Sequence, residues 1–203
     1  MKRVLMYKRF ERFWHWAQAV LVLMLAFTGF NIHGTFDVVS YEQASEMHGI
    51  LLWLLLGLWA FAIFWHFTTG EWKNYIPTTE KLGDVIRYYS SGIFKGEEHP
   101  YEKTPEKKLN PLQRIAYLKL KLIINPGLII SGLLYLFYNE WPEAVAAILS
   151  LEIVALIHTA FAFFMVTFVI VHVYLITTGH TVGAHLKSMV TGYEDIPDHK
   201  GAE

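Results

Sequence analysis

The sequence of 203 residues contains no cysteine. This absence excludes disulfide bonds, iron–sulfur clusters bound through thiolates, and the C-x-x-C-H attachment of c-type haem. A surplus of positive charge is also missing, because 17 Lys and Arg residues are balanced by 18 Asp and Glu residues for a net charge of −1. Nucleic-acid binding therefore has no support in the composition. Any redox cofactor must be held by side chains other than cysteine.

Hydrophobic residues are abundant, at 54% of the chain with 16% aromatic. Four apolar runs have at least the roughly 20 residues that a helix needs to cross about 30 Å of hydrocarbon, and they lie at 13–33, 47–67, 116–138 and 151–177. Lipid offers no partners for backbone amides, so each run should be helical. The sequence predicts an all-α membrane protein, a bundle of four transmembrane helices forming a single domain over residues 1–203.

Basic residues are missing from two of the loops between these runs. Positions 34–46 and 139–150 contain no Lys or Arg, whereas five basic residues precede the first run, ten lie between Thr68 and Lys121, and two follow the fourth run. By the positive-inside rule both termini are predicted to be cytoplasmic. Within the long inner loop, apolar side chains at helical spacing predict a short amphipathic helix along the membrane surface: Leu82, Val85, Ile86, Tyr89 and Ile93.

Two histidines in the fourth apolar run suggest cofactor ligands. His158 and His172 are fourteen residues apart, which is only about 40° short of four helical turns and corresponds to a rise of about 21 Å. They therefore project from nearly one face at two depths. A low-spin haem iron needs two axial ligands from opposite sides, and His48 and His15 supply a partner at the outer and inner depth, respectively.

This spacing predicts two haem b groups, with His48 and His158 as the outer pair of axial ligands and His15 and His172 as the inner pair. A single membrane histidine can instead be an interhelical hydrogen-bonding residue, but four at two matched depths favour the haem interpretation, since intramembrane ionisable residues are costly.

Small residues also occur at fourteen-residue spacing. Gly29 lies fourteen positions beyond His15, and Ala62 fourteen beyond His48, so each ligand helix presents a small residue where the other haem would pass. Ordinary small-residue contacts between helices explain them equally well. His66, eighteen residues beyond His48, lies on the same face as His48 at the inner end. It could contact a quinone, replace His15 as a ligand, bind a third cofactor or line a proton path.

Four sequence features together resemble a known family over nearly the whole chain. They are the R-x-x-H-W motif at Arg12 to Trp16, His48 followed by Gly49, the His158 and His172 pair, and HVYLITTGHTVGAHLKSMVTG running from the fourth span. The chain resembles the di-haem cytochrome b subunits of membrane formate dehydrogenase, nickel–iron hydrogenase and thiosulfate reductase, which are bacterial cytochrome b561-like proteins. The family pairs its haem ligands as spacing and depth predict here.

The resemblance implies a function and partners. The chain would carry electrons across a bacterial or archaeal cytoplasmic membrane, between a periplasmic iron–sulfur or multihaem cytochrome subunit with its catalytic subunit and a quinone, menaquinone or ubiquinone. It also suggests that Asn110 and Gln113, in KKLNPLQR, lie beside the quinone. The competing interpretation is that Asn110 and Pro111 form the N-cap and first turn of the third helix.

Three other classes of membrane protein compete with this interpretation. A histidine-relay proton channel or transporter should have Asp or Glu inside its spans, and here only the end residues Glu46 and Glu152 occur. A di-iron oxidase should have a tight H-x-x-x-H or H-x-x-H-H cluster, which the sequence lacks. A cofactor-free membrane anchor remains a third alternative. The short acidic outer loops suit a docking face for a partner, and the chain has no obvious substrate of its own.

Overall fold

The computed structural model describes residues 2–101, 103–179 and 181–196. It confirms the predicted all-α membrane bundle, because four helical stretches are long and apolar enough to cross a bilayer. In chain order the elements are β1 Lys2–Leu5, α1 Arg9–Ile32, α2 Tyr41–Thr69, η1 Glu71–Tyr75, α3 Leu82–Arg87, η2 Tyr88–Gly92, η3 Ile93–Lys95, α4 Pro111–Lys119, η4 Leu120–Ile124, α5 Asn125–Leu136, η5 Tyr138–Glu140, α6 Glu143–Ala146, α7 Leu151–Ile176, α8 Ala184–Thr191 and β2 Tyr193–Ile196.

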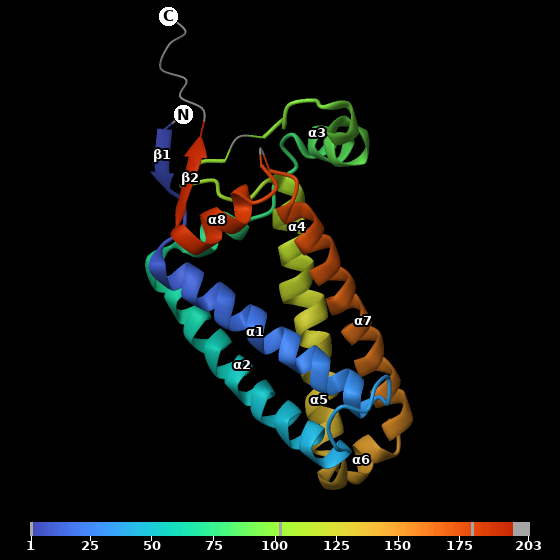
Figure 1. Cartoon of the computed structure of the whole chain (residues 1–203). Coiled ribbons are helices and arrows are strands. Elements are labelled where there is room, and N and C mark those ends of the chain that lie inside the picture. The colour runs from blue at the N-terminus through green and yellow to red at the C-terminus, as the bar shows by residue number, and fades with distance from the viewer. Residues whose placement is uncertain (1, 102, 180, 197–203) are drawn as a thin grey trace, which may run out of the picture.

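The long helices associate in two pairs, with α1 packed along α2 and α5 packed along α7 (Figure 1). Both strands, α3 and α8 lie at one end of the bundle, and α6 lies at the opposite end. We call the first the terminal end and the second the distal end. Phe61, Phe64 and Phe67 of α2 are each more than half exposed. Such apolar exposure on a long helix matches a surface that faces lipid.

The third span is one helical stretch with an irregular turn. It begins at a capping box in which the side chain of Asn110 accepts a hydrogen bond from the Gln113 backbone N–H, and Pro111 occupies the first turn. The sequence predicts an interruption at Asn125 to Gly127, and the structure has π-helical pairing just before it, with the Asn125 N–H donating to the Leu120 carbonyl. Pro126 has no N–H for the preceding turn, which explains why the regular ladder changes there.

The terminal end contains both a predicted and an unpredicted element. The predicted helix is confirmed as α3 continued by η2 and η3. Val85 of its predicted apolar face is buried, as is Tyr88, whereas Ile86 is 45% exposed. Its position along the membrane surface stays a prediction. The antiparallel pairing of β1 with β2, in which Lys2 is opposite Ile196 and Leu5 opposite Tyr193, was not predicted from the sequence. These strands are only four residues long and come from opposite ends of the chain. Such short, distant partners leave too little periodic pattern to recognise.

Gly127 of α5 packs against Phe161 of α7. A Cβ atom at this position would be 2.5 Å from two ring carbons of Phe161. We expect Gly127→Ala to lower the free energy of unfolding by about 1–3 kcal/mol, because a rigid ring must be displaced from a packed interface. Thermal unfolding followed by circular dichroism in detergent measures this loss. Gly57→Ala is the matched control, since its Cβ would meet no atom within 4 Å; equal stability of the two variants would contradict the prediction.

Candidate haem sites

The two histidines of α7 each face a histidine from the other helix pair. His158 faces His48 of α2 toward the distal end, with ring centroids 6.3 Å apart and ring planes at 76°. His172 faces His15 of α1 toward the terminal end, with centroids 6.1 Å apart and planes at 52°. The structure thus brings together the four residues that the sequence singles out, in the combinations that spacing and depth predict.

The separations of these rings fit a shared metal. Two imidazoles that bind one iron from opposite sides, through bonds of about 2 Å, place their ring centroids about 6 Å apart. Both observed separations agree with this value. Two imidazoles joined by a direct hydrogen bond, with about 3 Å between their nitrogen atoms, would have ring centroids closer together than 6 Å. The residues present therefore fit two haem groups, each between an α7 histidine and a histidine of the α1–α2 pair.

The distal histidines each have a hydroxyl partner that sequence reasoning missed. Nδ1 of His48 lies 2.9 Å from the Thr28 hydroxyl of α1. Nδ1 of His158 lies 2.9 Å from the Ser131 hydroxyl of α5. Both hydroxyl side chains are buried. Partners of this kind fix the orientation of a ligand imidazole and leave its other nitrogen for the metal.

Glycines lie beside the same two rings. A Cβ on Gly29 would be 3.3 Å from Cε1 of His48, and a Cβ on Gly132 would be 3.1 Å from Cε1 of His158. Gly29 therefore lies at the depth of the distal pair, beside the His48 ring. Its role in clearing a porphyrin stays a prediction. A sequence signal for the missed residues existed, because Thr28-Gly29 and Ser131-Gly132 are matching hydroxyl–glycine dipeptides inside two spans.

His66 occupies a different environment from the paired histidines. It is buried near the terminal end of α2, and its Nδ1 lies 2.6 Å from the carbonyl oxygen of Ala62. Its ring contacts Trp14 at 5.1 Å and Tyr75 at 5.6 Å between centroids. The ring opposite His172 is that of His15 rather than His66. Ala62 is also buried, and its role in haem clearance stays a prediction.

Asn110 and Gln113 serve as a helix cap in the structure. The Gln113 backbone N–H donates to Asn110 Oδ1 at 2.8 Å, and the Asn110 backbone N–H donates to Gln113 Oε1 at 3.0 Å. This reciprocal arrangement satisfies two amides at the start of α4. The Asn110 side chain is buried. The capping alternative therefore accounts for both residues, and contact with a quinone stays a prediction.

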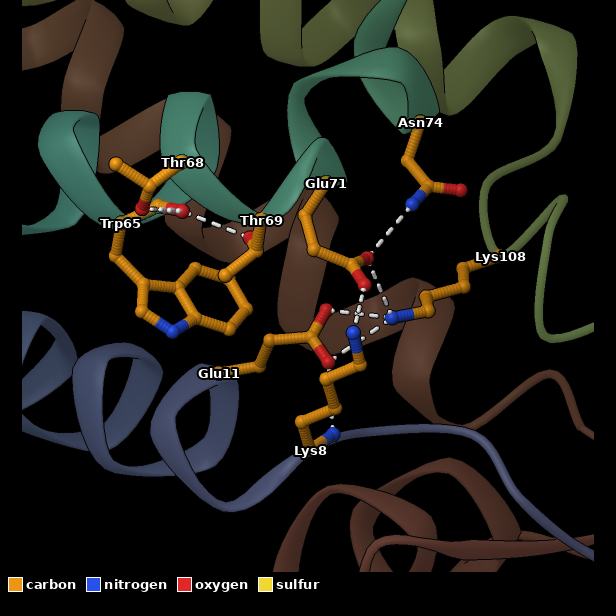
Figure 2. Close-up of polar contacts among 8 residues, drawn as sticks. All are labelled: Lys8, Glu11, Trp65, Thr68, Thr69, Glu71, Asn74 and Lys108. Carbon is orange, nitrogen blue, oxygen red and sulfur yellow. Dashed lines mark hydrogen bonds and ion pairs between the residues drawn. The ribbon is translucent and has the colours of Figure 1, made fainter.

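An ion cluster joins three segments at the terminal end (Figure 2). The ammonium of Lys108 lies 2.7 Å from Glu11 Oε1 and 2.9 Å from Glu71 Oε2, and Lys8 Nζ lies 2.6 Å from Glu71 Oε1. Asn74 also donates to Glu71 at 3.0 Å. The Lys108 side chain is 6% exposed, and those of Glu11 and Glu71 are 12% exposed. The cluster thus connects α1, η1 and the loop before α4. Lys108 and both carboxylates are largely shielded from water, whereas the Lys8 side chain is 54% exposed.

The electrostatics of this cluster favour its charged form. Burial raises the pKa of Glu71, but the hydrogen bonds from Lys8 and Lys108 more than offset it, so the pKa lies below its ordinary value. The hydrogen bond to Glu71 raises the pKa of Lys8. This cluster could not be predicted from the sequence because its members are far apart in the chain. Glu11 and Lys108 are separated by 97 positions.

Comparison with known proteins gives a consistent result. A family model described as prokaryotic cytochrome b561 matches residues 6–192. A chain named as a cytochrome, YdhU of Escherichia coli (strain K12), is 31% identical over 199 residues, which cover 95% of this chain and 75% of that protein. The part of this chain that the family model matches contains all four paired histidines and both hydroxyl–glycine dipeptides.

Proposed function

This chain belongs to the prokaryotic cytochrome b561 family, whose members bind haem b, and on that premise we propose that it is the di-haem b subunit of a respiratory oxidoreductase complex. As a multi-pass membrane b-type cytochrome it acts in electron transfer. The observation that carries the proposal of two haems is the pair of facing imidazole sets, each about 6 Å between ring centroids.

In this proposal the chain's residues bind and orient the cofactors. His48 and His158 hold one haem, and His15 and His172 hold the other. A bound haem supplies a one-electron couple whose potential depends on its axial ligands and their hydrogen bonds. The histidines of each pair come from different helix pairs, so bound haem would also connect the α1–α2 pair to α7.

The proposed orientation places the terminal end in the cytoplasm. Fifteen of the seventeen basic residues lie before the first span or between Thr68 and Lys121, and the loops 34–46 and 139–150 have none. The quinone, menaquinone or ubiquinone, would react near the terminal pair. His66 is a candidate contact because it is buried at this end beside Tyr75, and Lys121 Nζ lies 3.2 Å from the centre of the Tyr75 ring. Quinone contact by Asn110 or Gln113 would require opening their cap.

The proposed partner is a periplasmic iron–sulfur or multihaem cytochrome subunit that connects to a catalytic subunit. The distal surface suits such a partner because it carries Glu42, Glu46 and Glu140 without a basic residue in either loop. Electrons would enter or leave through the distal haem and exchange with quinone at the terminal end. The complex would then carry electrons from one side of the membrane to the other.

The haem content of the purified chain tests the proposal. We expect about two haem b per chain, quantified by the pyridine haemochrome, and a reduced-minus-oxidised spectrum with a b-type α-band. Addition of a quinol in proteoliposomes should reduce the haem. A colourless chain would instead support the cofactor-free anchor or a histidine-relay transporter. Haem that does not respond to quinol would contradict the quinone part of the proposal.

A further inference from the structure

The two distal histidines rest on matching structures that come from different helices. His48 lies against Thr28-Gly29 of α1, and His158 lies against Ser131-Gly132 of α5. In each case Nδ1 is 2.9 Å from the hydroxyl oxygen, and the following glycine lies beside Cε1 of the ring. The same arrangement on both sides of one proposed haem indicates a shared role.

The direction of these hydrogen bonds follows from the proton count. The Thr28 hydroxyl donates to the carbonyl oxygen of Met24 at 2.9 Å, and the Ser131 hydroxyl donates to the carbonyl oxygen of Gly127. A hydroxyl has one proton, so once it donates to a carbonyl it can only accept from the imidazole. With Nε2 as the iron ligand, as proposed, Nδ1 carries the ring proton, and each distal imidazole donates it to the adjacent hydroxyl. The backbone carbonyls of Leu25 and Leu128 also accept hydrogen bonds from His48 and His158.

The glycines allow this approach. A methyl group at Gly29 or Gly132 would lie 3.3 or 3.1 Å from Cε1 of the neighbouring ring, which is closer than ordinary carbon contacts. The ring would have to move away by a few tenths of an ångström. Its Nδ1 would then move relative to the adjacent hydroxyl, so the dipeptide acts as one unit in setting the position of the imidazole.

The surroundings of the terminal pair differ. Nδ1 of His15 is buried and has no hydrogen-bond partner within the part of the chain that the structure describes. His172 is flanked by rings instead, with Phe168 stacked on it at 5.9 Å and Tyr117 at 6.3 Å between centroids. The two pairs thus differ in what polarises their ligands.

We propose that Thr28 and Ser131 are positioning residues that lower the reduction potential of the distal haem relative to the terminal haem. The inference rests on the proposed haem ligation. A hydrogen-bond acceptor at Nδ1 makes an imidazole a more basic ligand, and a more basic ligand stabilises the oxidised iron. Electron transfer is then favourable from the distal haem to the terminal haem, which is toward the proposed quinone site.

The test replaces the hydroxyls in the purified full-length chain. Thr28→Val combined with Ser131→Ala should make reduction of one haem about tenfold more favourable, a rise of about 59 mV for a one-electron couple, while the other haem keeps its potential. Redox titration followed by optical and EPR spectroscopy resolves the two. Thr28→Ser keeps the hydroxyl and should keep the original potential. If Thr28→Val yields no protein, Ser131→Ala, which removes a single oxygen, carries the test alone.

Thr167→Val is the matched control. The Thr167 hydroxyl also donates to the carbonyl one turn earlier, Phe163 at 2.9 Å, but Thr167 is exposed on α7, and no hydrogen bond joins it to a histidine among the described residues. Two haems with unshifted potentials in the double variant would overturn this inference and leave the proposed function intact. Absence of haem from the unmodified chain would overturn the proposed function itself, so the two failures are distinguishable.

Discussion

His158→Ala is expected to remove one of two haems and to leave the other in place. The reason is geometric, because His158 and His172 lie fourteen residues apart on one helix, a rise of about 21 Å, and each faces a different partner ring. Loss of one axial ligand should therefore release only the haem at that depth. His172→Ala should produce the complementary chain, with the distal haem retained. Haem per chain and the shape of the α-band measure both outcomes.

Two control variants sharpen this experiment. His33→Ala alters an exposed histidine at the end of α1 and should keep both haems. His66→Ala tests the alternative that His66 replaces His15 as a ligand. Because His66 contacts Trp14 and the ring that faces His172 is His15, we expect this variant to keep both haems. Retention of two haems in both the His158 and His172 variants would contradict the ligand assignment. Loss of a haem in the His66 variant would contradict the pairing at the terminal end.

The parts of the structure that the sequence predicted are those in which spacing translates directly into geometry. A span in lipid must be helical, so fourteen residues specify a face and a depth without knowledge of the neighbours. The expected positions of His15, His48, His158 and His172 needed only this rule. Boundaries were less accurate, because polar caps extend helices past their apolar runs. α2 begins at Tyr41 through a capping box at Ser40, six positions before the predicted span.

The contacts between helices could not be predicted in the same way. Thr28 and Ser131 reach their imidazoles only because α1 packs beside α2 and α5 beside α7, and nothing in either local sequence specifies that neighbour. A serine or threonine in a span is also commonly satisfied by its own helix. The ion cluster posed a similar difficulty, since Lys108 pairs with residues 97 and 37 positions away. Such pairs depend on the path of the whole chain.

Lys108→Met is expected to destabilise the terminal end strongly. The substitution removes the ammonium that lies between Glu11 and Glu71 and leaves two poorly exposed carboxylates with Lys8 as their remaining basic neighbour in the cluster. Removing one partner of a buried ion pair typically costs about 3–5 kcal/mol, because the remaining charge is uncompensated. Thermal unfolding in detergent should show this loss. Lys107→Met is the control, since its side chain is exposed one position earlier.

A second substitution separates charge from packing. If the loss arises from repulsion and desolvation of the carboxylates, adding Glu71→Gln to Lys108→Met should recover part of it, and the two effects should be non-additive. If Lys108 acts mainly through its aliphatic stem, methionine replaces that stem and stability should match the Lys107→Met control. The cluster connects the start of α1, which carries His15, to the segments after α2 and before α4. Loss of its charge balance should therefore weaken haem retention at the terminal pair before the distal pair, which the haem content of the heated variant would reveal.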